Sequence, residues 1–312
     1  MRLVFLGTPS FAVPTLERIL AAGHEVLAVY TQPDRPKGRG GALAASPVKT
    51  AAVSRRLPVY QPERIKRPEP LAHLASLRPD AIVVVGYGQI IPQNIIDVPP
   101  LGIINVHASL LPKYRGAAPM QWALARGESV TGVTTMRIDA GLDTGDILLM
   151  RETPISSGET AIELGARLSI IGAELLVETL NGLSAGAIIP RKQDHSQATL
   201  APILRKEDGV IDWNLPAAEI YNRVRGFVPW PGACTRFRGE GLHVWRAAVA
   251  ESSSSGPPGS LSVGERRALV ACGGGTSLEL LEVQLEGRKK IAMEAFINGQ
   301  RLGHNELLGD MT

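Results

Sequence analysis

The sequence has 312 residues, 44% hydrophobic and 20% charged, with a formal net charge of +3, which is typical of a soluble globular protein of about two domains. The cysteine content excludes a disulfide framework and a zinc site, because only Cys234 and Cys272 are present, far apart and without a CxxC motif. The N-terminal run MRLVFLGTPSFAVP is too short for a membrane span and lacks a signal-peptide cleavage pattern. We therefore expect a cytoplasmic protein with neither a membrane partner nor a bound metal.

The first half of the chain alternates predicted strands and helices. Strands are expected over residues 2–7 and 25–32 with a helix over 11–22 between them, and such a βαβ unit predicts a parallel sheet. The cycle repeats with a short strand in LPVYQP, a helix over 71–77 and a strand over 80–88. The run GIINVH that follows is almost continuously apolar, as expected of a central strand covered on both faces.

The second half changes from this α/β pattern to short strands. A helix near 120–126, strands in TGVTTMRI and DILLMRETPI, and a helix over 160–180 complete the first pattern. Periodicity is then lost, so we place a basic linker at 191–206, between a domain of residues 1–190 and a domain of residues 207–312. The latter contains a short helix and five strand-like runs separated by Gly and Ser clusters, which is typical of a small β-barrel.

Residues 35–67 carry a strong local excess of positive charge. Nine Lys or Arg residues face one acid, Glu63, and such a patch favours a polyanionic partner, although an ordinary solvated face is the alternative interpretation. The nine are Arg35, Lys37, Arg39, Lys49, Arg55, Arg56, Arg64, Lys66 and Arg67. The linker region adds Arg191, Lys192, Arg205 and Lys206.

The clearest chemical motif is INVHASLLPKYRGAAP, residues 103–118, where a buried strand ends in a polar loop. Alternate residues of a strand point to the same side, so Asn105 and His107 can face one small volume. Ligands of open parallel sheets bind beyond the carboxyl ends of the strands, where Gly7, Gly86 and His107 are all predicted to lie. An amide and an imidazolium N–H are suited there to a carbonyl oxygen that becomes negative during acyl transfer. The alternative is a structural histidine and a strand-end Asn cap.

A second polar loop, DAGLDTGD, lies between two predicted strands and supplies carboxylates. Asp143 is flanked by two glycines, and a flexible backbone can present its side chain to the same site. There it could hold His107 in its charged form or relay a proton through water. The alternative, a turn residue bonded to its own backbone, fits Asp139 and Asp146 better.

Two other chemistries are disfavoured. GTPSF lacks the further glycines of a dinucleotide fingerprint and GYG is a lone G-x-G, so no nicotinamide cofactor is expected. Ser109 follows His107 at the next alternate position, but no G-x-S-x-G elbow surrounds it and such neighbours do not place a hydroxyl in line with the imidazole. A serine hydrolase is therefore not favoured.

The residues of these two loops, INVHASLLPKYRGAAP and GLDTGDIL, strongly resemble the N10-formyltetrahydrofolate-dependent formyltransferases. Within that family, FLGTPSFAVPTLERIL, TQPDRPKGRG, SPVK, IDWN and FVPWPGA are similar to the members that formylate methionyl-tRNA. The resemblance covers nearly the whole chain. It implies a Rossmann-like catalytic domain with a mostly parallel sheet, followed by a small OB-like β-barrel domain that binds tRNA.

The resemblance also implies a reaction and its residues. A formyl group would pass from 10-formyltetrahydrofolate, the co-substrate, to the α-amine of methionine on initiator methionyl-tRNA, for translation initiation. By resemblance, Asn105, His107 and Asp143 take the catalytic places. The folate contacts are expected at Ser109, Leu110, Leu111, Pro112 and Gly86. We expect a monomer.

The loop of residues 32–49 resembles the family segment that enters the tRNA acceptor stem, and Arg39 falls at its key arginine. The candidate tRNA contacts are Arg35, Lys37, Arg39, Lys192 and Lys206. GRGGALAASP carries small residues where many relatives have a pair of lysines, so a weaker electrostatic grip is expected from this loop.

Three rival functions share the candidate site. A formyltransferase acting on a glycinamide nucleotide or an amino sugar would use the same three residues, but the former usually ends where this linker begins. A formyltetrahydrofolate hydrolase would resemble this chain only after an N-terminal regulatory domain. An RNA-binding module built on a decayed transferase is the non-enzyme alternative, and intact Asn105, His107 and Asp143 speak against it.

Overall fold

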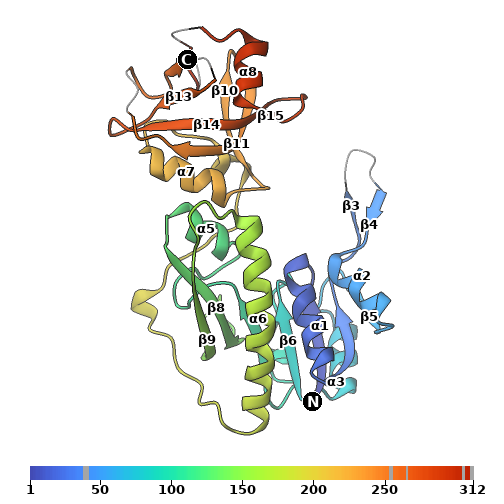
Figure 1. Ribbon diagram of the computed structural model, residues 1–312. Coiled ribbons are helices and arrows are strands. Elements are labelled where there is room, and N and C mark those ends of the chain that lie inside the picture. The colour runs from blue at the N-terminus through green and yellow to red at the C-terminus, as the bar shows by residue number, and fades with distance from the viewer. Residues whose placement is uncertain (38–41, 253–255, 265, 304–305, 310–312) are drawn as a thin grey trace. The chain divides into compact units, whose positions relative to one another are not determined.

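The computed structural model describes residues 1–37, 42–252, 256–264, 266–303 and 306–309 (Figure 1). The chain divides into two compact units. The first comprises Met1–Pro119, Val130–Pro154 and Gly165–Ala201, and the second Met120–Ser129, Ile155–Leu164 and Pro202–Thr312. Two short segments of the predicted domain of residues 1–190 thus group with the second unit, and the functional division at residues 190 and 206 stays a prediction.

The first unit is built on a seven-stranded sheet with the order β5-β2-β1-β6-β7-β8-β9. The parallel strands are β1 (Arg2–Gly7), β2 (Glu25–Tyr30), β5 (Val59–Tyr60), β6 (Ala81–Val85) and β7 (Ile103–His107). Two antiparallel strands, β8 (Val130–Arg137) and β9 (Ile147–Pro154), extend the sheet beyond β7. The predicted Rossmann-like, mostly parallel sheet is therefore confirmed.

The long helix α6 (Ala161–Ser184) crosses one face of this sheet, as Figure 1 shows, and packs against β7 and β8. Its close approach depends on Gly172, where a Cβ atom would lie 2.8 Å from Cγ1 of Val106. Further along, the hydroxyls of Thr135 and Thr179 lie 2.8 Å apart and join β8 to the helix. Val106 and Thr135 are thus buried under α6, and alternate residues of β7 point to the other face.

The other face of the sheet is covered by α3 (Pro68–Leu77) and α4 (Gln93–Ile96). Leu74 and Ile95 of these helices belong to one buried cluster with residues of β1, β6 and β7. The strand residues of this cluster are Val4, Leu6, Ile82, Val84 and Ile103. Asn105 pairs in register with Val84. Because Asn105 and His107 alternate with Val106, they lie on this face, at the carboxyl end of β7.

Several elements of the first unit were not predicted. The expected loop of residues 32–49 contains a hairpin of β3 (Arg35–Lys37) and β4 (Ala42–Ala44), which projects from the sheet in Figure 1. It is followed by α2 (Pro47–Ser54), where the side chain of Ser46 caps the first turn by accepting a hydrogen bond from the Lys49 N–H. The remaining helix, α1 (Val13–Ala21), agrees with the predicted helix.

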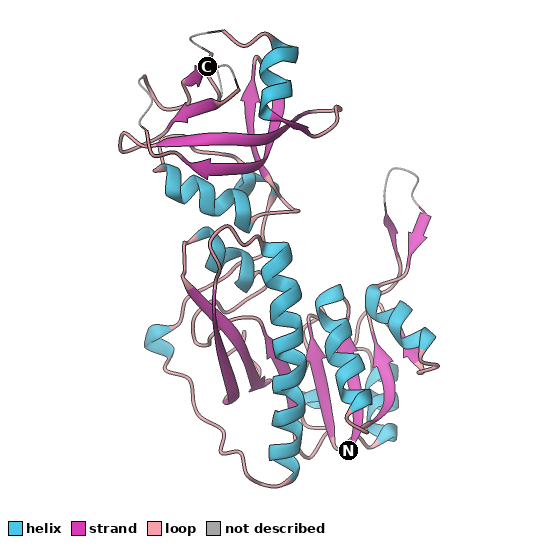
Figure 2. Cartoon of the chain, in the orientation of Figure 1, coloured by secondary structure: helices cyan, strands magenta, loops and turns pink. Residues whose placement is uncertain are grey.

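The second unit is an antiparallel sheet with the order β10-β11-β14-β13-β12, seen as magenta strands in Figure 2. Its strands are β10 (Ala233–Phe237), β11 (Glu240–Val249), β12 (Leu261–Val263), β13 (Ala268–Ala271), β14 (Ser277–Leu285) and β15 (Ile291–Ala292). Phe237 of β10 bridges to Leu308, and Ser260 beside β12 bridges to Leu307. This C-terminal segment therefore joins both edge strands and closes the predicted barrel.

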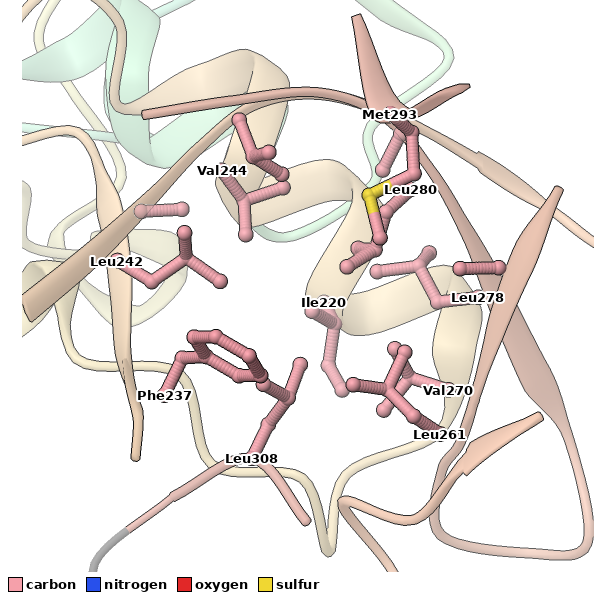
Figure 3. Close-up of a cluster of buried hydrophobic side chains, with 14 of the residues drawn as sticks. Ile220, Phe237, Leu242, Val244, Leu261, Val270, Leu278, Leu280, Met293 and Leu308 are labelled. Atoms are coloured by element: carbon pink, nitrogen blue, oxygen red, sulfur yellow. The ribbon is translucent and has the colours of Figure 1, made fainter. Parts of the chain in front are cut away.

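The barrel encloses a core of aliphatic and aromatic side chains (Figure 3). Helix α7 (Ala217–Gly226) contributes Ile220, which is 1% exposed, and the unpredicted α8 (Met293–Gln300) contributes Phe296 against Phe237. Helix α5 (Pro119–Ala125) belongs to the same unit, where Trp122 contacts Phe227 edge to face. In the part of the chain that the structure describes, no helix has the length and apolarity needed to cross a membrane.

Candidate active site

The side chains of Asn105, His107 and Asp143 meet at the carboxyl end of β7. Nδ2 of Asn105 lies 3.5 Å from Oδ1 of Asp143, and Nδ1 of His107 lies 3.7 Å from Oδ2 of the same carboxylate. The Asp143 side chain is 17% exposed and that of His107 only 6%, while Asn105 is half-buried. The structure thus brings together the three residues to which the sequence assigns catalysis, and their catalytic roles stay predictions.

The loop between β8 and β9 presents Asp143 through an unusual backbone conformation. Asp143 has a φ of +51°, a left-handed geometry that Asp and Asn adopt more readily than most residues. The turn before it is fixed by Asp139, whose Oδ1 accepts hydrogen bonds from the Gly141 N–H at 3.0 Å and the Thr144 hydroxyl at 2.7 Å. Asp139 is therefore the turn residue that the sequence predicts, and Asp143 is free to point toward His107.

The two nitrogens of His107 have different partners. Nε2 lies 2.8 Å from the carbonyl oxygen of Tyr114, and since a carbonyl only accepts, Nε2 carries a proton. Nδ1 is then the nitrogen that gains or loses a proton, and it faces Asp143. A reacting group can therefore use only Nδ1, the nitrogen on the side of the Asp143 carboxylate.

A main-chain group also fixes the carboxylate of Asp143. The Gly116 N–H donates a hydrogen bond to its Oδ2 at 2.9 Å. Gly116 has a φ of +121°, and a Cβ atom there would lie 2.6 Å from the carbonyl oxygen of Ala201, so only glycine fits. The short segment of residues 114–116 therefore orients both His107 and Asp143.

The predicted folate loop is held by its own hydrogen bonds. The Ser109 hydroxyl is buried and donates to the Lys113 carbonyl at 2.7 Å, a bond that speaks further against a nucleophilic serine. Leu111 is 3% exposed and packs with Met136 and Ile147. Leu110 and Pro112 are partly exposed. The folate contacts of this loop stay predictions.

Gly86 directly follows β6, the strand beside β7. Its φ is +58°, and a Cβ atom at this position would lie 3.0 Å from the ring of Pro9. The backbone conformation and the close approach of Pro9 both require glycine here. In an open sheet of this kind, ligands bind where the strand order reverses. Here the chain runs outward from β1 through β2 to β5 and then returns to β6, on the other side of β1. A folate contact at Gly86 fits this position and stays a prediction.

The predicted tRNA contacts are spread over three segments. Arg35 is an exposed residue of the β3–β4 hairpin, Lys37 ends β3, and Arg39 lies outside the described residues. Lys192 is exposed and follows Arg191, which forms a β-bridge with Ile147, the first residue of β9. Lys206 is exposed and begins a short 3-10 helix, Lys206–Gly209, of the second unit.

Part of the predicted basic patch is neutralised by neighbouring acids. Nζ of Lys49 lies 2.6 Å from Oδ2 of Asp34, and Arg55 pairs with Glu17 at 3.2 Å. Hydrogen bonds from Lys49 and Gln61 lower the pKa of Asp34 below its usual value. The contacts of Asp34 tie together the base of the β3–β4 hairpin, and both ion pairs leave fewer free cations than the sequence suggests.

Sequence reasoning missed two buried polar residues of this site, Arg115 and Gln193. Each is 6% exposed, and the two side chains bond to one another although 78 positions separate them. Arg115 lies inside the quoted motif and Gln193 between the cations of the linker, where no periodic pattern marks either. The feature that distinguishes these two polar side chains is their burial, which can be recognised only once the fold is known.

The chain matches the formyl transferase family over residues 1–180 and the formyl transferase C-terminal domain over residues 203–301. It is 64% identical over 310 residues to the methionyl-tRNA formyltransferase of Solibacter usitatus, with 99% of both chains covered. The methionyl-tRNA formyltransferase of Koribacter versatilis is 58% identical over 313 residues, with 100% of both chains covered.

Solved structures share the fold at lower identity. The N-formyltransferase of Helicobacter canadensis, in complex with folinic acid and dTDP-3-aminofucose, superposes with a TM-score of 0.67 at 18% identity, covering 89% of this chain and 98% of that one. Glycinamide ribonucleotide transformylase 1 of Symbiobacterium toebii gives a TM-score of 0.52 at 21% identity. The superposition includes 94% of the transformylase but only 62% of this chain.

Proposed function

The chain belongs to the formyl transferase family, and from this premise we propose that it transfers a formyl group from 10-formyltetrahydrofolate to the α-amine of methionine on initiator methionyl-tRNA. Relatives that carry the name methionyl-tRNA formyltransferase match over its full length, including the C-terminal domain. The glycinamide ribonucleotide transformylase covers only 62% of the chain, which favours the tRNA substrate. The reaction makes the chain an enzyme of translation initiation.

The chemistry needs no side-chain nucleophile. The α-amine has a pKa of about 7.7 to 8.0, so a useful fraction is neutral near pH 7 and attacks the formyl carbon directly. The new C–N bond forms first and gives a tetrahedral oxyanion; its collapse breaks the bond to N10 of the folate, and the amine proton passes to N10. The protein contributes orientation of the two substrates and stabilisation of the tetrahedral oxyanion.

Each residue of the site has a distinct role in this mechanism. Nδ2 of Asn105 and the protonated Nδ1 of His107 donate to the formyl oxygen as it becomes negative. Asp143 supports the charge of His107 and relays the amine proton toward the departing nitrogen. The convergence of these three side chains at the end of β7 is the observation that carries the proposal.

The remaining assignments complete the proposal. The folate contacts are Ser109, Leu110, Leu111, Pro112 and Gly86. The tRNA contacts are Arg35, Lys37, Arg39, Lys192 and Lys206. The protein acts in the cytoplasm as a monomer, with catalysis in residues 1–190 and tRNA binding in residues 207–312.

A substrate comparison tests the function. The protein is incubated with 10-formyltetrahydrofolate and, separately, with methionyl-tRNA, glycinamide ribonucleotide or an amino-sugar nucleotide. Formylation of methionine alone is expected. Formyl transfer to another acceptor, or formate release without any acceptor, would replace the proposal with one of the rival functions, and no turnover at all would support the RNA-binding alternative.

A further inference from the structure

A buried polar bridge connects the Asp143 loop to the segment that follows α6. Nε2 of Gln193 donates hydrogen bonds to the carbonyl oxygens of Asp143 and Gly145, each at 2.8 Å. Its Oε1 accepts two hydrogen bonds from Arg115, from Nε at 3.1 Å and from Nη2 at 2.6 Å. The amide of Gln193 thus uses both ends, and we call this contact set the Arg115–Gln193 bridge.

Arg115 is an unusual member of this bridge because its charge is buried. Its guanidinium is bonded to two neutral acceptors, Oε1 of Gln193 and Nδ1 of His195 at 3.1 Å, and it forms no ion pair with a carboxylate of the described residues. Burying a cation without an anionic partner is costly, so neither packing nor pairing accounts for an arginine at this position. A role in the neighbouring site would account for it.

The main chain of Arg115 links the bridge to both proposed catalytic groups. On one side, the Tyr114 carbonyl accepts from Nε2 of His107, and on the other the Gly116 N–H donates to Asp143. Arg115 itself is fixed by its N–H to the Thr199 carbonyl at 2.8 Å and by its carbonyl to the Ala201 N–H at 2.7 Å. A displacement of Arg115 therefore moves the partners of His107 and Asp143 together.

We propose that Arg115 and Gln193 are positioning residues for formyl transfer, holding Asp143 and His107 at their working separation. The inference rests on the proposed function and adds the Arg115–Gln193 bridge to the active site. The exposed Lys192, a proposed tRNA contact, is the direct neighbour of the buried Gln193. Two consecutive residues of this segment thus have different roles: Lys192 contacts the tRNA, and Gln193 holds the loop that contains Asp143.

The variant Gln193→Glu tests this role with little change in shape. It keeps acceptors for Arg115 but replaces the two N–H donors with an oxygen that repels the carbonyls of Asp143 and Gly145. We expect kcat to fall by at least tenfold, because a displacement of about 1 Å in a catalytic group costs up to about 100-fold. The KM values for 10-formyltetrahydrofolate and methionyl-tRNA should stay within about twofold of wild type.

The pH profile of kcat gives a readout that a merely structural role would not move. Asp143 and His107 face one another, and the Arg115 guanidinium, which donates to Nδ1 of His195, reaches them through Gln193, so a changed Asp143–His107 separation shifts the acidic limb of the profile. Arg115→Met should cause a similar loss. The double variant Arg115→Met/Gln193→Met should cost no more than the worse of its two single variants, Arg115→Met and Gln193→Met, since both act through one bridge.

Gln197→Glu is the matched control. Gln197 lies in the same segment, is exposed, and bonds to Asp194 at 2.9 Å, away from the bridge. It should leave kcat and its pH profile unchanged. Circular dichroism and binding of 5-formyltetrahydrofolate check that each variant is folded. Should Gln193→Glu fail this check, Gln193→Asn, one methylene shorter, takes its place with the same expected loss.

The outcomes separate this inference from the proposed function. A wild-type protein that does not formylate methionyl-tRNA would refute the function itself. An active wild type with a Gln193→Glu variant of normal kcat and unchanged pH profile would overturn the positioning role alone. A rise in KM at constant kcat would also overturn it, because that pattern indicates a substrate contact.

Discussion

Nδ1 of His107 lies 3.7 Å from Oδ2 of Asp143, and one short main-chain segment holds both side chains in place. The carbonyl of Tyr114 accepts a hydrogen bond from the other ring nitrogen of His107, Nε2, and the N–H of Gly116 donates one to the carboxylate of Asp143. The imidazole can therefore exchange a proton only on the side that faces Asp143. This geometry makes a single His–Asp pair, rather than a chain of titrating groups, the proton-handling part of the proposed mechanism.

Loss of the Asn105 amide should impair turnover far more than folate binding. In Asn105→Ala, one donor to the oxyanion disappears, and such a loss typically costs about 2.7 to 4 kcal/mol of barrier, or about 10²- to 10³-fold in kcat. Single-turnover formylation and equilibrium binding of 5-formyltetrahydrofolate measure the two effects separately. Asn94→Ala, an exposed residue of α4, serves as control. Near-normal turnover in Asn105→Ala would remove the residue from the mechanism.

The charge of Asp143 should matter more than its shape. Asp143→Asn retains an oxygen that can accept the hydrogen bond from Gly116 but removes the negative charge beside His107. We expect kcat to drop by about 10²-fold or more, the usual range for loss of general acid–base assistance. The measurement is the pH dependence of kcat for both proteins. If the variant retains the wild-type profile, Asp143 does not handle the proton.

The ion pair between Lys49 and Asp34 should position the β3–β4 hairpin for tRNA. Lys49→Met removes the 2.6 Å contact at the hairpin base, so we expect a higher KM for methionyl-tRNA and an unchanged KM for 10-formyltetrahydrofolate. Steady-state kinetics with each substrate varied in turn measure this. Arg67→Met, which removes an exposed ion pair with Glu63 outside the hairpin, is the control. An equal rise in both KM values would contradict a tRNA role for the hairpin.

The same pair makes a pH-dependent contribution to stability. Because the folded state lowers the pKa of Asp34, its stabilisation is fully present above the unfolded pKa of 3.8 and disappears as the pH falls through the lower folded value. The difference in unfolding free energy between wild type and Lys49→Met should therefore shrink below pH 3.8. Urea unfolding at several pH values tests this, and a difference that is constant with pH would mean that the charge pair contributes nothing.

Two glycine substitutions should change stability in opposite directions. Gly172→Ala places a Cβ atom 2.8 Å from Val106 under α6, and overpacking of this kind costs about 1–3 kcal/mol. Gly299→Ala, in the helix α8, meets no atom within 4 Å and should stabilise by about 0.4–1 kcal/mol through the unfolded chain. Chemical unfolding measures both, and Gly172→Ala/Val106→Ala should recover part of the loss if the clash is its cause.

The sequence by itself determined the parallel sheet and the location of the candidate site. Strands such as β6 and β7 are fixed by local apolar runs, and the two-residue period of a strand is enough to place Asn105 and His107 on one side. The hairpin β3–β4 was not predictable in this way, because its strands are three residues long and carry no alternating apolar pattern. Helix α8 was missed for a related reason: only the packing of Phe296 against Phe237 marks its buried face.

Only the tertiary structure decided what surrounds the site. The partners of His107 and Asp143 are main-chain groups of Tyr114 and Gly116, and a backbone carbonyl or N–H carries no signature in the sequence. Arg115 and Gln193 meet across 78 positions, and the cation of Lys49 finds its acid at Asp34. The physical reason is that sequence periodicity indicates which residues share a face of one helix or strand. These hydrogen bonds and ion pairs, in contrast, join residues that only the tertiary fold brings together.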